Sequence, residues 1–262
     1  MLKNVRGFLI DLEGTVYRGN VAIDGAAQAL AKLKDLGFGY RFVTNTTTLR
    51  RSSIQKKLVQ LGIPAHANEV FSAPYAAAQW LSMKPGAKCW ILTQGDAISE
   101  FDGFNLSLDE PDYIVLGDLR NDFSFDLLNR VFRALISGGE LIALQKNRFW
   151  LLDDQALLDV GAFVAALEYA TGKTALVMGK PSADFFRLAL KDLGLNSNQV
   201  AMVGDDLEAD ILGAQAEGMK AILVKTGKSA VATGGCNGVV QPDLTLESLG
   251  DMLDESFSAL LS

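Results

Sequence analysis

The stretch Phe8-Leu9-Ile10-Asp11-Leu12-Glu13-Gly14-Thr15 places two carboxylates, a glycine and a threonine directly after a short apolar run. Such a run, ended by a turn, is typical of a strand inside a parallel sheet, because both faces of that sheet are covered. In open α/β sheets, ligands bind beyond the carboxyl ends of the strands. The stretch therefore predicts a buried strand that delivers Asp11 and Glu13 to a pocket, with Gly14 letting backbone amides approach an anion. An Asp-initiated turn without a site is the alternative interpretation of these residues alone.

Composition narrows the class of protein. The chain has 262 residues, enough for one large domain or two smaller ones. Its 24 basic and 31 acidic residues give a net charge of −7, so neither nucleic acid nor an anionic membrane is an expected partner. No apolar stretch is long enough to cross a bilayer. The two cysteines, Cys89 and Cys236, have no metal-type spacing, which fits a reduced cytoplasmic protein. The single histidine, His66, makes Ser/His/Asp hydrolases and histidine-ligated zinc enzymes poor candidates.

Hydrophobic periodicity and turn residues predict strands that alternate with helices, which is the pattern of an α/β fold. Strands are expected at 8–11, 39–44, 69–72, 89–92, 113–116, 141–144, 148–152, 200–205 and 219–225, and just before Met178. Helices are expected at 26–36, 51–61, 74–81, 125–136, 155–170, 184–193 and 246–261, with another that carries Asp210 and ends near 217. The turn residues at 83–86 predict a boundary, so we place a second α/β domain at 83–176, inserted into the first.

Polar side chains follow several of the predicted strands. Thr44 and Asn45 come at the end of the strand 39–44, where they predict either a helix N-cap or an oxyanion site. Lys180 follows the strand before Met178 and precedes Pro181, which favours a helix start. A lone lysine at such a place is usually solvated, so its meaning depends on what else reaches the same edge.

A second pair of carboxylates repeats the opening pattern. Asp205 closes the strand 200–205, and Asp206 and Asp210 follow at the start of the next helix. The helix dipole alone accounts for acidic residues in a first turn, but it explains Asp205 less well, because Asp205 belongs to the strand end.

Together, Asp11, Glu13, Thr44, Lys180 and Asp205 form a set of side chains at or just after predicted strand ends. Clustered carboxylates repel one another unless a cation shares them, and an oxygen-rich site with few protein ligands suits Mg²⁺. A threonine hydroxyl and a lysine ammonium complete a cradle for a phosphoryl group. An aspartate can act as the nucleophile in such a site. The set therefore predicts a Mg²⁺-dependent phosphoryl-transfer site.

At these residues the chain resembles the haloacid dehalogenase superfamily, whose four motifs it carries in order. They are Asp11-Leu12-Glu13-Gly14-Thr15, Thr44-Asn45, Lys180-Pro181, and Gly204-Asp205-Asp206 with Asp210. The resemblance implies a Rossmann-like parallel-sheet core at 1–82 and 177–262. The insertion at 83–176 is similar to the C2-type cap of the NagD-like subfamily. The sequence at 161–171, running to 179–181, looks most like the branch of phospholysine phosphohistidine inorganic pyrophosphate phosphatase and its haloacid-dehalogenase-like relatives.

The resemblance also implies roles for individual residues. Asp11 would be the nucleophile and a Mg²⁺ ligand, with Asp205 as a second carboxylate ligand and Glu13 giving its backbone carbonyl to the metal. The remaining roles are phosphate binding by Thr44 and Asn45, orientation of Asp11 and charge compensation by Lys180, and support of the metal site by Asp206 and Asp210. The implied function is a phosphatase that hydrolyses a small phosphorylated compound through an aspartyl phosphate. Relatives with this cap include homodimers, so a homodimer is expected.

Glu13 departs from the pattern of the superfamily. Phosphatases of this group usually have an aspartate there, which protonates the leaving group and then activates water. Glutamate reaches one methylene further, and a misplacement near 1 Å can cost on the order of 100-fold in rate. The alternative function is therefore a catalytically weakened relative that binds Mg²⁺ and a phosphorylated ligand or a protein partner. A receiver-like domain phosphorylated on aspartate is disfavoured by the inserted cap and the order of the motifs.

Overall fold

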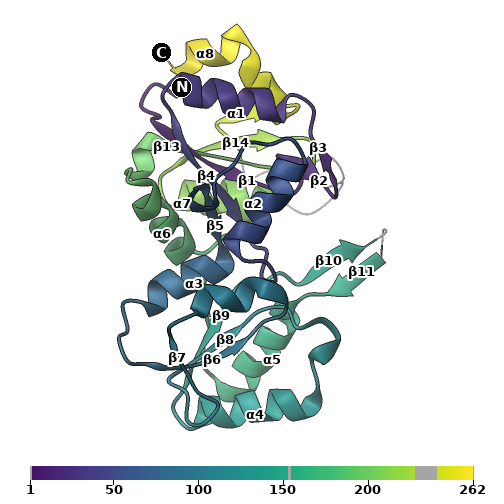
Figure 1. The fold of residues 1–262 in the computed structure, drawn as a ribbon, viewed down its shortest axis with the longest axis vertical. Coiled ribbons are helices and arrows are strands. Elements are labelled where there is room, and N and C mark those ends of the chain that lie inside the picture. Colours follow the sequence, from purple (N-terminus) through teal and green to yellow (C-terminus); the bar gives the residue numbers. More distant parts are fainter. Residues whose placement is uncertain (1, 153–154, 228–240, 262) are drawn as a thin grey trace. The chain divides into compact units, whose positions relative to one another are not determined.

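The computed structural model describes residues 2–152, 155–227 and 241–261. The chain forms two compact units, each with its own parallel sheet (Figure 1). The first unit comprises Met1–Thr44, Ser52–Phe71 and Lys180–Ser262, and the second comprises Asn45–Arg51 and Ser72–Gly179. Cys236 lies outside the described residues, and Cys89 is a free, buried cysteine. The boundaries expected from the sequence, at 83 and 176, stay a prediction.

A six-stranded sheet in the order β15-β14-β13-β1-β4-β5 organises the first unit. Its strands are β1 (Gly7–Asp11), β4 (Gly39–Thr44), β5 (Val70–Ser72), β13 (Val200–Gly204), β14 (Lys220–Val224) and β15 (Leu244–Leu246). The pairs from β15 to β4 are all parallel. Every residue of β1 and of β13 is buried, because these central strands are covered on both faces.

Helices surround this sheet in the first unit (Figure 1). They are α1 (Ala26–Asp35), α2 (Arg51–Gln60), α6 (Ala183–Leu193), α7 (Gly213–Ala216) and α8 (Glu255–Leu261), with a π-helical turn at Leu207–Leu212. The buried side chains of α6 recur at helical spacing, as expected for a helix that presents one apolar stripe to the core. The ring of Phe185 meets that of Phe71 edge to face, with centroids 5.3 Å apart. A small hairpin, β2 (Tyr17–Arg18) and β3 (Val21–Ala22), follows the opening motif.

The second unit contains a five-stranded parallel sheet in the order β12-β9-β8-β6-β7. Its strands are β6 (Lys88–Leu92), β7 (Asn105–Leu106), β8 (Tyr113–Leu116), β9 (Glu140–Ala143) and β12 (Leu176–Val177). Its helices are α3 (Ala73–Leu81), α4 (Phe125–Ile136) and α5 (Val160–Thr171). Apolar residues of α4 and α5 pack with those of β8 and β9 in one core cluster. A separate antiparallel hairpin is formed by β10 (Phe149–Leu152) and β11 (Gln155–Leu158).

The predicted α/β fold class is confirmed, but two expected helices are wrong in extent. Residues 155–158 form β11, and α5 begins only at Val160, because Asp159 caps the helix and Leu158 pairs with Phe149. Residues 246–261 divide into the end of β15, a 3-10 helix at Leu249–Leu253 and α8, since Ser248 caps the 3-10 helix. The helix carrying Asp210 begins after Asp206 as expected, but its first part is the π-helical turn. Strands β2, β3, β7 and β15 were not predicted, because runs of two or three residues carry little periodic signal.

In both sheets, the direction in which the chain adds successive strands reverses between two neighbouring strands. In the first unit, the chain continues from β1 to β4 on one side of this point, and from β13 to β14 on the other side. In the second unit, β6 leads on to β7 and β8 leads on to β9. At such a switch point the outgoing loops diverge and leave room beyond the strand ends, which is where open α/β sheets bind ligands. Among the described residues, no helix has the length and apolar composition needed to cross a membrane.

Candidate active site

The switch point of the first sheet carries the candidate site. Asp11 is the last residue of β1, and Asp205 follows the last residue of the neighbouring β13. Both carboxylates are buried, at 7% and 4% relative exposure. Asp210, from the π-helical turn after β13, is also buried, and carboxylate oxygens of Asp11, Asp205 and Asp210 all lie within 4.8 Å of one another. The structure thus brings three acidic side chains into one small volume.

Lys180 supplies a cation to this cluster. Its Nζ lies 2.5 Å from Oδ1 of Asp11 and 2.7 Å from Oδ1 of Asp210, and the side chain is 4% exposed. Burial by itself would lower the pKa of Lys180, but the charges of Asp11 and Asp210 outweigh burial and raise the pKa above its usual value. The lysine is therefore a fixed ammonium that holds both carboxylates in place, which excludes the solvated interpretation of a lone lysine.

One ammonium does not compensate the whole cluster. Burial raises the pKa of Asp11 from 3.8 to about 6; Lys180 opposes this rise and Asp205 adds to it. Burial likewise raises the pKa of Asp210 to about 7, opposed by Lys180 and increased by Asp11 and Asp206. Burial therefore disfavours the ionised forms of both carboxylates, and the positive charge of Lys180 offsets this effect only in part.

Two glycines allow the acidic side chains to approach so closely. Gly204 ends β13, and a Cβ at this position would overlap the carboxyl group of Asp210. Gly14 has a φ of +88°, and a Cβ there would lie 2.6 Å from Oδ2 of Asp205. A third glycine, Gly227, which the sequence analysis did not single out, is closer still, because a Cβ there would overlap the Asp205 carboxyl group. The glycines of the first and fourth motifs therefore make space for the carboxylates of the site.

The donor set fits a hard divalent cation. Carboxylate oxygens are the ligands of Mg²⁺, which is bound by one or two carboxylates together with waters and substrate phosphate. Asp11 and Asp205 are the carboxylates expected as ligands, and both are in the cluster. Asp210 instead has both oxygens occupied, since Oδ1 meets Lys180 and Oδ2 accepts from the backbone N–H of Asp206 at 3.1 Å. Asp210 is therefore suited to hold Lys180 in place rather than to bind the metal.

The Glu13 side chain lies outside the acidic cluster found among the described residues. It is exposed, and its Oε1 accepts a hydrogen bond of 2.7 Å from the backbone N–H of Gly19. Gly19 is the turn of the β2–β3 hairpin, and the N–H of Gly14 donates to the carbonyl of Tyr17 in the same hairpin at 2.7 Å. The carboxylate of Glu13 is therefore held by the hairpin, a contact that the sequence analysis did not anticipate.

The remaining predicted residues fall at the edges of the two units. Thr44 is buried at the end of β4 in the first unit, whereas Asn45 is the first residue of the second unit. Asp206 is the N-cap of the π-helical turn, where its side chain accepts from the N–H groups of Glu208 and Ala209 at 3.0 Å each. Asp206 therefore caps this turn, and its support of the metal site stays a prediction.

Comparison with known proteins confirms the resemblance. The family model for haloacid dehalogenase-like hydrolases matches residues 8–107, and a second model, described as HAD-hydrolase-like, matches residues 177–252. The phospholysine phosphohistidine inorganic pyrophosphate phosphatase of Danio rerio is 38% identical over 97% of this chain and 94% of its own length. The haloacid dehalogenase-like hydrolase domain-containing protein 2 of Bos taurus is 36% identical over 98% of both chains. The chain therefore belongs to the haloacid dehalogenase-like hydrolase family.

Solved structures agree with this assignment. The p-nitrophenyl phosphatase from Archaeoglobus fulgidus superposes with a TM-score of 0.88 at 30% identity, over 95% of this chain and 98% of that one. A glycerol phosphate phosphatase from Mycobacterium tuberculosis, in complex with magnesium, gives 0.82 at 28% identity, over 95% of this chain and 76% of that one. NagD from E. coli K-12 shares the fold, with a TM-score of 0.83 at 24% identity over 94% and 98% of the two chains.

We predict that Asp210→Asn changes the pH dependence of stability in the metal-free protein. The pKa of Asp210 is raised from 3.8 to about 7, so its protonation favours the folded state at acidic pH, and this contribution is lost as the pH rises through 7. The variant carries no such charge, so its free energy of unfolding relative to the native protein should increase from pH 5 to pH 8. Urea unfolding in EDTA measures the difference, with the exposed Asp126 on α4 giving the control Asp126→Asn. A relative stability of Asp210→Asn that falls over this range would contradict the raised pKa.

Proposed function

We propose that this hydrolase is a Mg²⁺-dependent phosphatase that acts on a small phosphorylated compound through an aspartyl phosphate on Asp11. The observation that carries the proposal is the buried ammonium of Lys180 between Asp11 and Asp210, next to Asp205 at the switch point of the sheet. Lys180 binds one carboxylate oxygen of Asp11 and so orients the group for attack. Aspartate nucleophiles of this kind divide a difficult hydrolysis into two easier steps.

In the first step, a carboxylate oxygen of Asp11 attacks phosphorus, and the bond from phosphorus to the leaving group breaks. The leaving group takes a proton from Glu13. In the second step, Glu13 accepts a proton from water, the water oxygen attacks the aspartyl phosphate, and inorganic phosphate leaves while Asp11 is regenerated. Thr44 and Asn45 bind the phosphoryl oxygens, and Lys180 offsets negative charge. A Mg²⁺ ion held by Asp11, Asp205 and the Glu13 carbonyl would supply further compensation of the phosphoryl charge.

The similar proteins support a range of candidate substrates. The printed names of the relatives and structures include a p-nitrophenyl phosphatase, a glycerol phosphate phosphatase and a phosphatase of phospholysine, phosphohistidine and pyrophosphate. Phosphoesters, phosphoramidates and pyrophosphate are therefore the compounds to test. In this proposal the core at 1–82 and 177–262 performs the chemistry, and the cap at 83–176 selects the substrate. The homodimer, the cytoplasmic location and the lack of a nucleic-acid partner stay predictions.

A second candidate function is favoured by the contact of Glu13 with Gly19. A carboxylate bound at 2.7 Å to the hairpin N–H must leave that partner before it can protonate a leaving group. If it does not, the chain binds Mg²⁺ and a phosphorylated ligand or a protein partner with little turnover.

Asp11→Asn tests the nucleophile. The variant keeps the size of the side chain but removes the nucleophilic carboxylate, so we expect phosphate release to fall by at least about a thousandfold. Release is measured over a panel of phosphoesters, phosphoramidates and pyrophosphate, with circular dichroism as the check on folding. Asp126→Asn is the matched control and should act like the native protein. A substantially active Asp11→Asn protein would rule out the aspartyl phosphate on this residue.

Mg²⁺ should stabilise the native protein against heat. At a concentration about 100 times the dissociation constant, binding contributes about 2.7 kcal/mol. For a chain of this size that is an increase in melting temperature of roughly 5–10 °C. Asp205→Asn should lose most of this increase because it removes a ligand, while Asp126→Asn should keep it. Equal increases in all three proteins would place the metal elsewhere.

Glu13→Gln separates the two candidate functions. Glutamine keeps an oxygen that can accept from Gly19, so the hairpin contact is preserved while the acid and base are lost. If Glu13 performs proton transfer, kcat should decrease by about 10²–10⁴-fold. An inactive native protein together with an active Glu13→Asp variant would instead favour the weakened relative.

A further inference from the structure

The segment Asn45–Arg51 belongs to the second unit, although the residues on both sides of it in the sequence belong to the first. It follows directly after Thr44, the buried end of β4. The pair Thr44-Asn45, to which the proposed function assigns phosphate binding, is therefore divided between the two units. What fixes this segment on the second unit also fixes Asn45.

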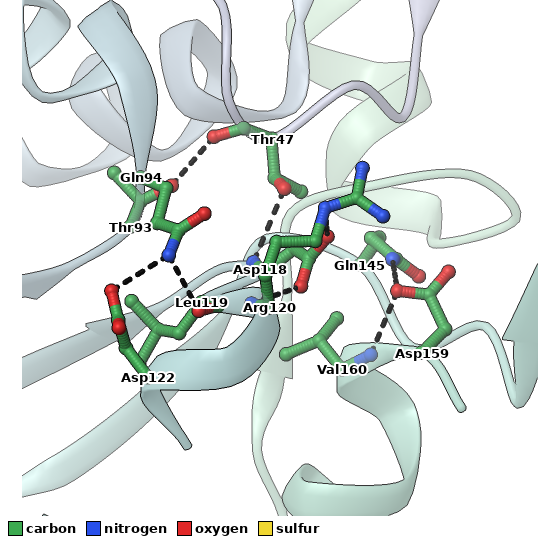
Figure 2. A network of polar contacts seen from close by, with 10 residues as sticks. All are labelled: Thr47, Thr93, Gln94, Asp118, Leu119, Arg120, Asp122, Gln145, Asp159 and Val160. Carbon is green, nitrogen blue, oxygen red and sulfur yellow. Dashed lines mark hydrogen bonds and ion pairs between the residues drawn. The ribbon is translucent and has the colours of Figure 1, made fainter. Parts of the chain in front are cut away.

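Thr47 makes two hydrogen bonds within the second unit, both drawn in Figure 2. Its carbonyl oxygen accepts from the hydroxyl of Thr93 at 2.6 Å, and its own hydroxyl accepts from the backbone N–H of Asp118 at 3.2 Å. The side chain is buried, at 5% exposure. A Cβ at Gly117 would lie 2.7 Å from the Thr93 hydroxyl, so this glycine keeps space for the contact.

The two hydrogen-bond partners show that Thr47 lies at the switch point of the second sheet. Thr93 follows β6 and Asp118 comes two residues after β8, and β6 and β8 flank the switch point of the second sheet. That position is where an open α/β sheet binds a ligand. In the second unit, the segment Asn45–Arg51 of the chain itself occupies this position. Thr47 contacts the loop that follows each of the two flanking strands.

The rest of the segment is bound to the 3-10 helix at Gly95–Phe101. The carbonyl of Thr48 accepts from the N–H of Ala97 at 3.3 Å. The N–H of Arg50 donates to Asp96 at 2.9 Å, and the N–H of Arg51 donates to Glu100 at 2.7 Å. Since α2 begins at Arg51, these carboxylates also serve amides at a helix start that have no partner within the helix. The segment is therefore held by backbone and side-chain contacts at its middle and at its C-terminal end.

We propose that Thr47 is a positioning residue for phosphate binding. Its two hydrogen bonds fix the segment Asn45–Arg51 within the second unit and thereby set the position of Asn45, the residue to which the proposed function assigns phosphate binding. Close packing also holds Asn45 in the second unit, because a Cβ at Gly179 would lie 2.9 Å from Oδ1 of Asn45. The inference rests on the proposed function, in which Asn45 contacts phosphate.

Three variants test it. Thr47→Val keeps the shape of the side chain but removes the acceptor of the Asp118 N–H, whereas Thr47→Ser keeps the hydroxyl. Thr48→Val is the matched control, because the neighbouring Thr48 hydroxyl makes no hydrogen bond among the described residues and only its carbonyl holds the segment. The probe is inorganic phosphate, titrated by calorimetry into each protein with saturating Mg²⁺. Mg²⁺ affinity without phosphate and hydrogen exchange of the Arg50 and Arg51 amides are measured in parallel.

We expect Thr47→Val to weaken phosphate binding by roughly fivefold to tenfold, the effect of one lost hydrogen bond. The Arg50 and Arg51 amides should exchange faster in this variant, and Mg²⁺ affinity should not change, because the carboxylates are in the first unit. Thr47→Ser and Thr48→Val should match the native protein in all three measurements. Phosphate affinity in Thr47→Val equal to that of Thr48→Val would overturn the inference alone. A native protein that binds no phosphate would overturn the proposed function, and the inference with it.

Discussion

The buried ammonium of Lys180 is the contact on which the site depends. It meets Asp11 from β1 and Asp210 from the turn after β13, so it joins the ends of two strands that are far apart in the sequence. Removing one member of such a buried group leaves an uncompensated charge, which costs several kcal/mol. Three buried carboxylates and one ammonium meet here, and burial raises the pKa values of Asp11 and Asp210 against the opposing effect of Lys180. In the proposed function, a divalent cation would compensate this negative charge.

Both units have a switch point in their parallel sheet, but the two switch points have different contents. Each has a parallel sheet whose neighbouring strands send their loops in opposite directions. In the first unit the carboxyl ends of β1 and β13 present acidic side chains at that point. In the second unit the corresponding ends of β6 and β8 bind Thr47 of the chain itself. A switch point that contains a segment of its own chain serves to anchor that segment, which begins at Asn45.

The sequence predicts the strands and the residues at their ends well, because buried parallel strands are short apolar runs with clear limits. It predicts less well what depends on contacts distant in the sequence. It does not indicate that Asp210 pairs with Lys180, a contact for which Gly204 leaves room beside the Asp210 carboxyl group. The contact from Glu13 to Gly19 depends on strands of two residues, which have no periodicity to read. Residues 155–158 pair with 149–152, and such apolar runs are equally compatible with a helix.

The central claim is that the carboxylate of Asp11, oriented by Lys180, becomes phosphorylated during turnover. The most direct test is rapid acid quenching of the native protein with Mg²⁺ and an active substrate, followed by mass spectrometry of its peptides. The account predicts a phosphoryl group on Asp11 that appears before free phosphate accumulates and disappears as the substrate is exhausted. A phosphoryl group on another residue, or rapid turnover with no phosphorylated peptide at any time, would contradict it.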